Sequence, residues 1–199
     1  MGAVLEQLGG MRAAEIVAVV LAIAYLVLAI RQSVWCWPCA FVSTGIYIVL
    51  FHEVALFMES ALNAFYLAMA VYGFWVWTRG GPQGTPREVH VKPWVLHAVT
   101  AAGIAILVAA SGTWLAQNTA QALPYLDAFT TWSAVFATWL TAQKAIENWF
   151  YWLVIDIVSI GLYLERGLPL TALLFVLYVV LIPIGFLAWR RDLRRPELV

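Results

Sequence analysis

The chain has 199 residues, of which 64% are hydrophobic and only 11% are charged, and its eleven Lys and Arg residues balance eleven Asp and Glu residues. Soluble domains carry about 25% charged residues, so this chain could not cover its surface with polar groups in water. A formal charge of zero also excludes the basic field that a nucleic-acid-binding protein needs. The composition therefore predicts one integral membrane domain over residues 1–199, held in a lipid bilayer.

Seven apolar runs follow one another along the chain, and a helix of about 20 residues suffices to cross a bilayer. We expect membrane spans at residues 13–30, 34–51, 55–77, 94–111, 127–142, 148–164 and 168–189. A polar stretch with Gly and Pro at 78–93 precedes the fourth span, and an uncharged linker at 112–126 follows it. Membrane β-barrels show alternating segments of about ten residues, which this sequence lacks, so the predicted fold is all-α.

Positive charge is distributed unevenly between the two sides of these spans. With the N-terminus outside, nine of the eleven basic residues lie on the cytoplasmic side, as the positive-inside rule favours. These nine are Arg31, Arg79, Arg87, Lys92, Lys144, Arg190, Arg191, Arg194 and Arg195. The sequence therefore predicts an external N-terminus and a cytoplasmic C-terminus.

The third and seventh spans match each other at an offset of 112 residues. The most distinctive pairs are Glu53 with Glu165, Tyr66 with Tyr178, Gly73 with Gly185 and Trp77 with Trp189. The offset crosses four spans, so the two halves would have the same orientation in the membrane. We expect a parallel 3+1+3 repeat, with a first bundle at 13–77, a connector helix at 94–111 and a second bundle at 127–189. Two such bundles around one axis enclose a path for a solute.

Two helical faces carry groups that hydrocarbon disfavours. Glu59, Asn63 and Tyr66 share one face of the third span, because they are four and three residues apart. Such a face either packs as a polar seam between helices or lines a cavity.

Trp149, Trp152 and Asp156 share one face of the sixth span in the same way. One interpretation is a belt of interfacial tryptophans with a structural aspartate. The other is a binding site for a flat organic cation, because indole faces attract cations and a carboxylate supplies the counter-charge. Such a site would not suit an anionic nucleotide.

The stretch 147–152 together with Asp156 resembles the W-x-x-W-x-x-x-(N/D) signature of the PnuC family of bacterial vitamin transporters. Further matches are residues 72–77, Asp127 and Lys144. The resemblance covers about residues 13–191 and implies an architecture similar to that of SWEET sugar carriers. It places a substrate site between the two bundles, formed by the face with Asp156 and by the third span.

The resemblance also implies a function: import of nicotinamide riboside through the bacterial inner membrane by facilitated diffusion with alternating access. A cytoplasmic kinase would then phosphorylate and trap the vitamin, and no resident cofactor is required. The resemblance is compatible with a homo-oligomer, although no local motif indicates one. Two departures from the family pattern, Asp156 in place of Asn and Asn63 in place of Gln, leave thiamine as an alternative substrate.

Two other classes of protein fit the sequence less well. A membrane-embedded enzyme needs a catalytic cluster, and the candidates Glu59 and Asp156 are not accompanied by a His residue or a metal-binding set at catalytic spacing. A membrane scaffold would not need an aligned Trp-Trp-Asp face. The chain also lacks a phosphate-binding loop motif, so we do not expect it to hydrolyse ATP.

Overall fold

The computed structural model describes residues 13–53, 57–119, 123–165, 167 and 169–193. Seven α-helices lie in these ranges: α2 (Ala13–Ile30), α3 (Cys36–Glu53), α4 (Phe57–Arg79), α5 (Trp94–Asn118), α6 (Pro124–Ala142), α7 (Asn148–Glu165) and α8 (Pro169–Leu193). A short 3-10 helix, η1 (Pro82–Gly84), lies between α4 and α5. The predicted all-α class with seven helices is confirmed.

The fourth and fifth spans differ most from their expected bounds. Helix α5 continues to Asn118, past the expected end at residue 111, because no proline or charged residue interrupts it. It ends where the side chains of Asn118 and Thr119 bond to carbonyl groups of the preceding turn, at 2.8 and 2.7 Å. Helix α6 begins at Pro124 rather than at residue 127, since a proline fits a first turn that needs no N–H group. The expected linker at 112–126 is therefore largely helical.

The ends of the third and seventh spans also extend past the hydrophobic runs. Helix α4 ends at Arg79 and α8 at Leu193, because a helix can continue into the polar region beyond the hydrocarbon. Some predicted features lie outside the described residues: the span starts at 55 and 168, the side chain of Glu59, and Arg194 and Arg195.

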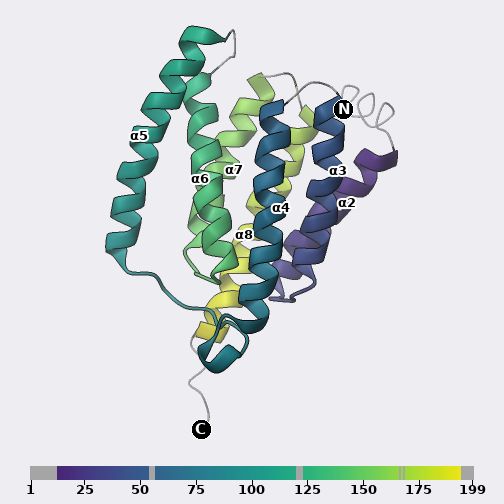
Figure 1. The fold of residues 1–199 in the computed structure, drawn as a ribbon, viewed down its shortest axis with the longest axis vertical. Coiled ribbons are helices and arrows are strands. Elements are labelled where there is room, and N and C mark those ends of the chain that lie inside the picture. The colour runs from purple at the N-terminus through teal and green to yellow at the C-terminus, as the bar shows by residue number, and fades with distance from the viewer. Residues whose placement is uncertain (1–12, 54–56, 120–122, 166, 168, 194–199) are drawn as a thin grey trace.

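Helix α5 lies at one edge of the molecule (Figure 1), and the contacts between the other six helices divide them into the groups α2–α4 and α6–α8. Helix α3 packs against α2 and α4, and α7 packs against α6 and α8. The two groups meet where α4 contacts α6 and where α2 contacts α8, while α5 packs against α6. Any path between the groups is therefore walled by helices from both halves of the chain.

The outer surfaces of the helices are apolar. Val20 on α2, Ile106 on α5 and Val180 on α8 are each more than half exposed. Such side chains would promote aggregation in water, but they are well solvated by lipid chains. Helix α5 and the part Thr171–Leu193 of α8 are each long and apolar enough to cross a bilayer. These surfaces are those of a helical bundle in a membrane.

Four indoles pack edge to face in two equivalent pairs. The rings of Trp37 and Trp77 lie 5.5 Å apart at 88°, and those of Trp149 and Trp189 lie 5.4 Å apart at 87°. The two pairs are related by the 112-residue offset, and they join through Trp77 and Trp189, whose rings are 5.9 Å apart. We call these four residues the tryptophan layer.

Two hydrogen bonds across the bundles follow the same offset. The indole N–H of Trp77 donates to the carbonyl oxygen of Thr141 at 3.1 Å, and that of Trp189 donates to the carbonyl oxygen of Ala29 at 3.0 Å. Each bond joins the last helix of one bundle to the first helix of the other. The tryptophan layer therefore ties the two bundles together at one end.

The turns that precede α3 and α7 have matching backbones. Gln32 and Lys144, again at the 112-residue offset, both adopt a left-handed conformation with φ of 54°. Lys144 is buried, and its Nζ atom lies 4.7 Å from the centre of the Trp77 ring. Burial lowers the pKa of Lys144, while the ring face stabilises its charged form.

Candidate functional site

A cavity of about 300 Å³ lies between the two bundles, and we call it the central cavity. Its wall is built from α2, α3, α4, α6, α7 and α8, which is every described α-helix except α5. Ring faces, hydroxyl groups and one carboxylate all occur on this wall. Such a mixture suits a flat solute with several polar groups.

The wall includes four of the six residues that the sequence proposes for the site: Tyr66, Trp149, Trp152 and Asp156. Asn63 lies on α4 but not on this wall, although it is one turn from Tyr66. The backbone of Glu59 belongs to α4, and its side chain lies outside the described residues. Among the described side chains, the structure therefore brings the complete α7 face together with Tyr66 of the α4 face.

Asp156 supplies the carboxylate of the cavity wall. It is only 2% exposed, and its Oδ1 atom has no hydrogen-bond partner among the described residues. Burial of a carboxylate without a partner is costly, which makes Asp156 a candidate for contact with a ligand. Asp156 can therefore accept a hydrogen bond from a solute or balance its positive charge.

Hydrogen bonds within the second bundle fix the ring of Trp152. Its indole N–H donates to the hydroxyl of Thr141 at 3.1 Å, and this hydroxyl lies 3.3 Å from Oδ1 of the buried Asn148. The amide of Asn148 in turn donates to the carbonyl oxygen of Ala145 at 2.7 Å. Trp152 is thus held by its N–H edge on the wall of the central cavity.

Four further aromatic residues of the wall were not proposed for the site from the sequence. These are Tyr25, Trp37, Phe175 and Tyr178. The internal offset was the signal that could have found two of them, because it pairs Trp37 with Trp149 and Tyr178 with Tyr66.

Two glycines allow the indoles of the central cavity to approach α4 and α8 closely. A Cβ atom on Gly73 would overlap the ring of Trp37, and one on Gly185 would overlap the ring of Trp149. The two glycines are also related by the 112-residue offset. In each bundle, a glycine on the last helix (α4 or α8) therefore leaves room for a tryptophan ring on the middle helix (α3 or α7).

Gly185→Ala is expected to displace the Trp149 ring and to lower the stability of the folded protein by about 1–3 kcal/mol through overpacking. Thermal unfolding of the purified protein measures this loss. Gly161→Ala on α7 is the matched control, because a Cβ atom there meets no atom within 4 Å. Equal unfolding temperatures for the two variants would show that Trp149 can move away freely.

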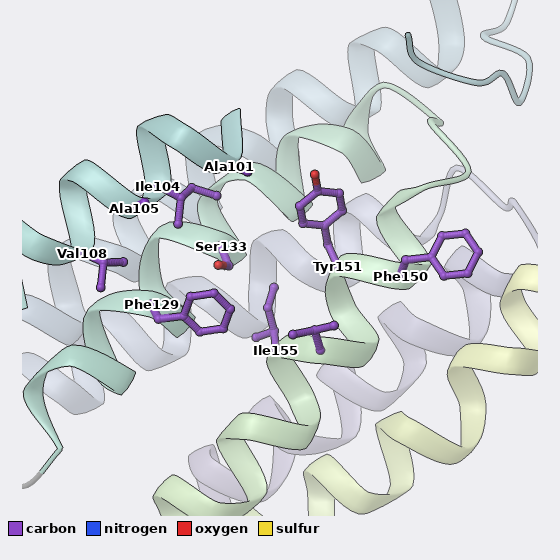
Figure 2. A pocket seen from close by; sticks show the side chains of 10 residues that line it. Ala101, Ile104, Ala105, Val108, Phe129, Ser133, Phe150, Tyr151 and Ile155 are labelled. Atoms are coloured by element: carbon purple, nitrogen blue, oxygen red, sulfur yellow. The ribbon is translucent and has the colours of Figure 1, made fainter. Parts of the chain in front are cut away.

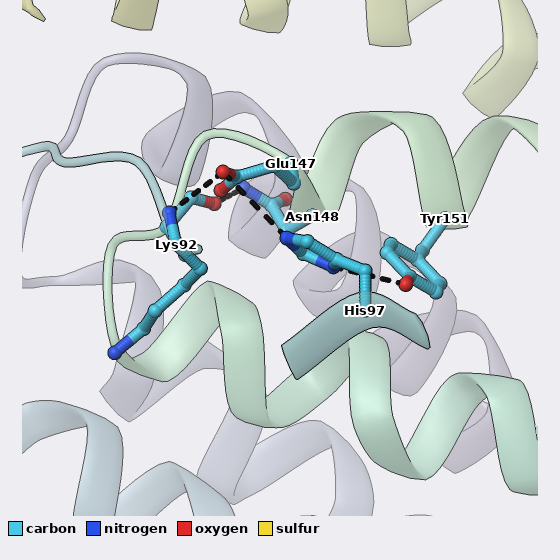
Figure 3. A network of polar contacts seen from close by, with 6 residues as sticks. Lys92, His97, Glu147, Asn148 and Tyr151 are labelled. Carbon is cyan, nitrogen blue, oxygen red and sulfur yellow. Dashed lines mark hydrogen bonds and ion pairs between the residues drawn. The ribbon is translucent and has the colours of Figure 1, made fainter. Parts of the chain in front are cut away.

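A polar network holds the start of α7 against α5 (Figure 3). The Oε1 atom of Glu147 accepts a hydrogen bond from the backbone N–H of Lys92 at 2.7 Å and lies 3.7 Å from Nε2 of His97. The other ring nitrogen of His97 lies 3.0 Å from the hydroxyl of Tyr151. These contacts fix the turn that immediately precedes the cavity residues Asn148 and Trp149.

A hollow of about 400 Å³ lies between α5 and the helices α6 and α7 (Figure 2). Its wall is almost entirely apolar, with Ile104, Phe129 and Ile155 among its side chains. This wall offers hydrocarbon contacts but no charge for a polar solute. Within the described ranges, no group of three His, Cys, Asp or Glu side chains could hold a metal ion.

The chain matches the family described as nicotinamide mononucleotide transporter over residues 12–191. It is 28% identical over 187 residues to the riboflavin/roseoflavin transporter RibM of Streptomyces davaonensis, a match that covers 90% of this chain and 87% of that protein. It is 24% identical over 174 residues to the nicotinamide riboside transporter PnuC of Escherichia coli, with coverage of 73% and 72%. The PnuC protein of Neisseria mucosa is 26% identical over 171 residues, with coverage of 77% and 63%.

The fold is similar to that in a crystal structure of the vitamin B3 transporter PnuC. The TM-score is 0.70 at 22% sequence identity, and the match covers 92% of this chain and 82% of that chain. Together with the family match over residues 12–191, this similarity shows that the chain belongs to the nicotinamide mononucleotide transporter family, as a PnuC-type membrane transporter of vitamins rather than an enzyme.

Proposed function

We propose that the protein carries nicotinamide riboside across the bacterial cytoplasmic membrane through the central cavity. The observation that carries this proposal is the unpartnered carboxylate of Asp156 on a wall that also includes Trp149 and Trp152. Nicotinamide riboside has a flat, positively charged ring, which can stack on indole faces and pair with a carboxylate. Relatives named as nicotinamide riboside transporters support the same substrate.

We propose alternating access as the mechanism, with the two bundles rocking about the central cavity. The equivalent indole pairs and the equivalent hydrogen bonds from Trp77 and Trp189 support a parallel repeat of α2–α4 and α6–α8, with α5 as the connector. In such a repeat, breaking the contacts at one end opens the cavity on that side. Net uptake then follows the gradient of the free vitamin, which a cytoplasmic kinase keeps steep by phosphorylation.

The orientation that we propose has the tryptophan layer on the cytoplasmic side. Arg79 is the last residue of α4, two positions after Trp77, and Arg190 directly follows Trp189 in α8. The C-terminal ends of α4 and α8 lie at the same end of the bundle (Figure 1). Basic residues near the ends of spans favour the cytoplasmic side. The C-terminus is then cytoplasmic, and the cavity is closed toward the cytoplasm.

Riboflavin is the second candidate substrate, because the similarity to the riboflavin/roseoflavin transporter RibM extends over 90% of the chain. Its ring system is also flat and can stack on Trp152, but it is neutral and does not need the charge of Asp156. Nicotinamide mononucleotide, after which the family is described, carries a phosphate group that Asp156 would repel. Thiamine, another flat cation, remains the alternative from the sequence.

Uptake into liposomes that contain only this protein tests the proposal. Labelled nicotinamide riboside is expected to exchange across the membrane without any ion gradient, and to accumulate only when a phosphorylating kinase is enclosed. Parallel assays with riboflavin, thiamine and nicotinamide mononucleotide rank the substrates. Accumulation of unmodified vitamin driven by a proton gradient alone would instead indicate a coupled transporter.

A further inference from the structure

The hollow beside α5 is a second concave site, and the proposed transport path does not use it. It lies between α5 and the helices α6 and α7 and has a volume of about 400 Å³, within the range typical of small-molecule sites. Figure 2 shows Ile104 and Val108 of α5 on one side and Phe150 and Ile155 of α7 on the other. Because α5 packs against α6, the hollow is the space that remains between α5 and α7.

The wall of the hollow favours hydrocarbon over water. Its side chains are almost all apolar, and the hydroxyl of Tyr151, one of its few polar groups, lies 3.0 Å from Nδ1 of His97. A buried water needs about two to four polar partners, whereas an unfilled void loses dispersion contacts. In a bilayer, the hollow is therefore filled by an acyl chain or by apolar side chains of a second copy of the protein.

Two aromatic rings connect the hollow with a cation near the end of α8. Phe150, on the wall of the hollow, is 54% exposed, and the centre of its ring lies 5.0 Å from that of Phe186 on α8. The guanidinium carbon of Arg190 lies 6.0 Å from the centre of the Phe186 ring. An apolar path thus leads from a positive charge into the hollow.

The charge of Arg190 favours a phospholipid over a second copy of the protein. Arg190 is exposed, and among the described residues it makes a ring contact but no ion pair. The neighbouring acid, Asp192, accepts a hydrogen bond from Gln32. An anionic phospholipid carries a phosphate and an apolar chain on one molecule, and basic pockets between membrane helices bind such headgroups. A second copy would have to supply the anion and the apolar group separately.

We propose that the hollow holds one acyl chain of an anionic phospholipid whose phosphate lies at Arg190. The lipid belongs to the leaflet on the side of the tryptophan layer, and its chain passes Phe186 and Phe150 before it enters the space between α5 and α7. Ile155 on the wall of the hollow directly precedes Asp156 on the wall of the central cavity. The chain therefore supports α7 from behind the face that carries the cavity residues.

Native mass spectrometry of the purified full-length protein tests the contact with the headgroup. The probes are phosphatidylglycerol and phosphatidylcholine with identical acyl chains. We expect phosphatidylglycerol to bind about fivefold more tightly, and Arg190→Gln to reduce this preference to about twofold or less. Arg79→Gln is the matched control, because Arg79 is exposed at the same end of the bundle but belongs to α4. Equal binding of the two lipids to the wild type, or a full preference in Arg190→Gln, overturns the proposal.

A substitution that fills the hollow tests the position of the acyl chain. Ala105→Phe places a ring in the hollow and should weaken binding of both lipids at least about fivefold. Ala102→Phe, on the same helix but not on this wall, should leave binding unchanged, and both alanines are exposed, so the protein should still fold. Unchanged binding in Ala105→Phe contradicts the proposal. If Ala105→Phe instead changes the oligomeric mass of the lipid-free protein, the hollow is an interface between copies of the chain and the lipid assignment is wrong.

Photocrosslinking locates the chain in liposomes. Phosphatidylglycerol with a photoreactive diazirine in the middle of one acyl chain should label Val108 and Val154 on the wall of the hollow more strongly than Ile106, which is 69% exposed on α5 and not on this wall. Equal labelling of these three residues would indicate surrounding bulk lipid only and would overturn the proposal. No vitamin is present in any of these assays, so the lipid site and the proposed transport function fail or stand independently.

Discussion

Asp156→Asn is expected to weaken binding of nicotinamide riboside by about tenfold to a hundredfold, since a charge-assisted contact in a buried site contributes about 1.5–3 kcal/mol. The substitution keeps the shape of the side chain and removes its charge. Thiamine should lose more affinity than nicotinamide riboside, because its aminopyrimidine donates to a carboxylate, whereas a neutral amide can still bond to a carboxamide or a ribosyl hydroxyl. Calorimetry of both vitamins against the wild type and the variant measures the two losses.

The ligand-free Asp156→Asn protein should unfold at the same temperature as the wild type or at a higher one. The wild-type carboxylate is buried with one oxygen unpaired, so replacing it by a neutral group removes a desolvation cost. Glu165→Gln, at the exposed end of the same helix, removes a charge away from the cavity and should leave affinity unchanged. A fall in stability of Asp156→Asn with normal affinity would show that the aspartate holds a neighbouring helix instead.

Trp152→Ala is expected to remove a stacking surface worth about 1–3 kcal/mol, which again corresponds to a loss of about tenfold or more in affinity. The hydroxyl of Thr141 loses its indole donor but keeps its contact with the carbonyl oxygen of Ala137 at 2.9 Å, so the protein should still fold. Equilibrium binding to the purified variant is the measurement.

Two further variants locate the effect of Trp152. Trp152→Phe retains a ring without the N–H group and should keep most of the affinity. Trp132→Ala, on α6, removes an indole that donates to the hydroxyl of Ser111 and does not line the central cavity. If Trp132→Ala and Trp152→Ala reduce affinity equally, the loss reflects general packing rather than stacking.

The number and type of the helices were predictable because hydrophobic length is a local property of the sequence. Their ends were less predictable. Helix α5 extends to Asn118 because no proline or cap ends it earlier. The predicted end at residue 111 was too early because it followed the fall in hydropathy, which does not by itself end a helix. Pro124 is the first residue of α6, but from the sequence a proline is equally compatible with a linker.

The α7 face of the site was predictable because Trp149, Trp152 and Asp156 lie on one side of one helix, whatever that helix packs against. The α4 face was only partly predictable. Tyr66 lines the central cavity and Asn63 does not, although helical spacing places them on the same side. The rotation and crossing of α4 against its neighbours decide which of the two reaches the wall.

The sequence by itself determined a membrane protein of seven helices, the 112-residue correspondence and the aromatic and acidic face of α7, because composition and periodicity are read along the chain. The tertiary structure decided what these parts enclose. It placed Trp37 and Trp149 from different bundles on one cavity and gave Trp77 and Trp189 their partners on the opposite bundle. It also left Asp156 buried with an unpaired oxygen. These features depend on distances between residues far apart in the chain, and only the packing of the helices sets those distances.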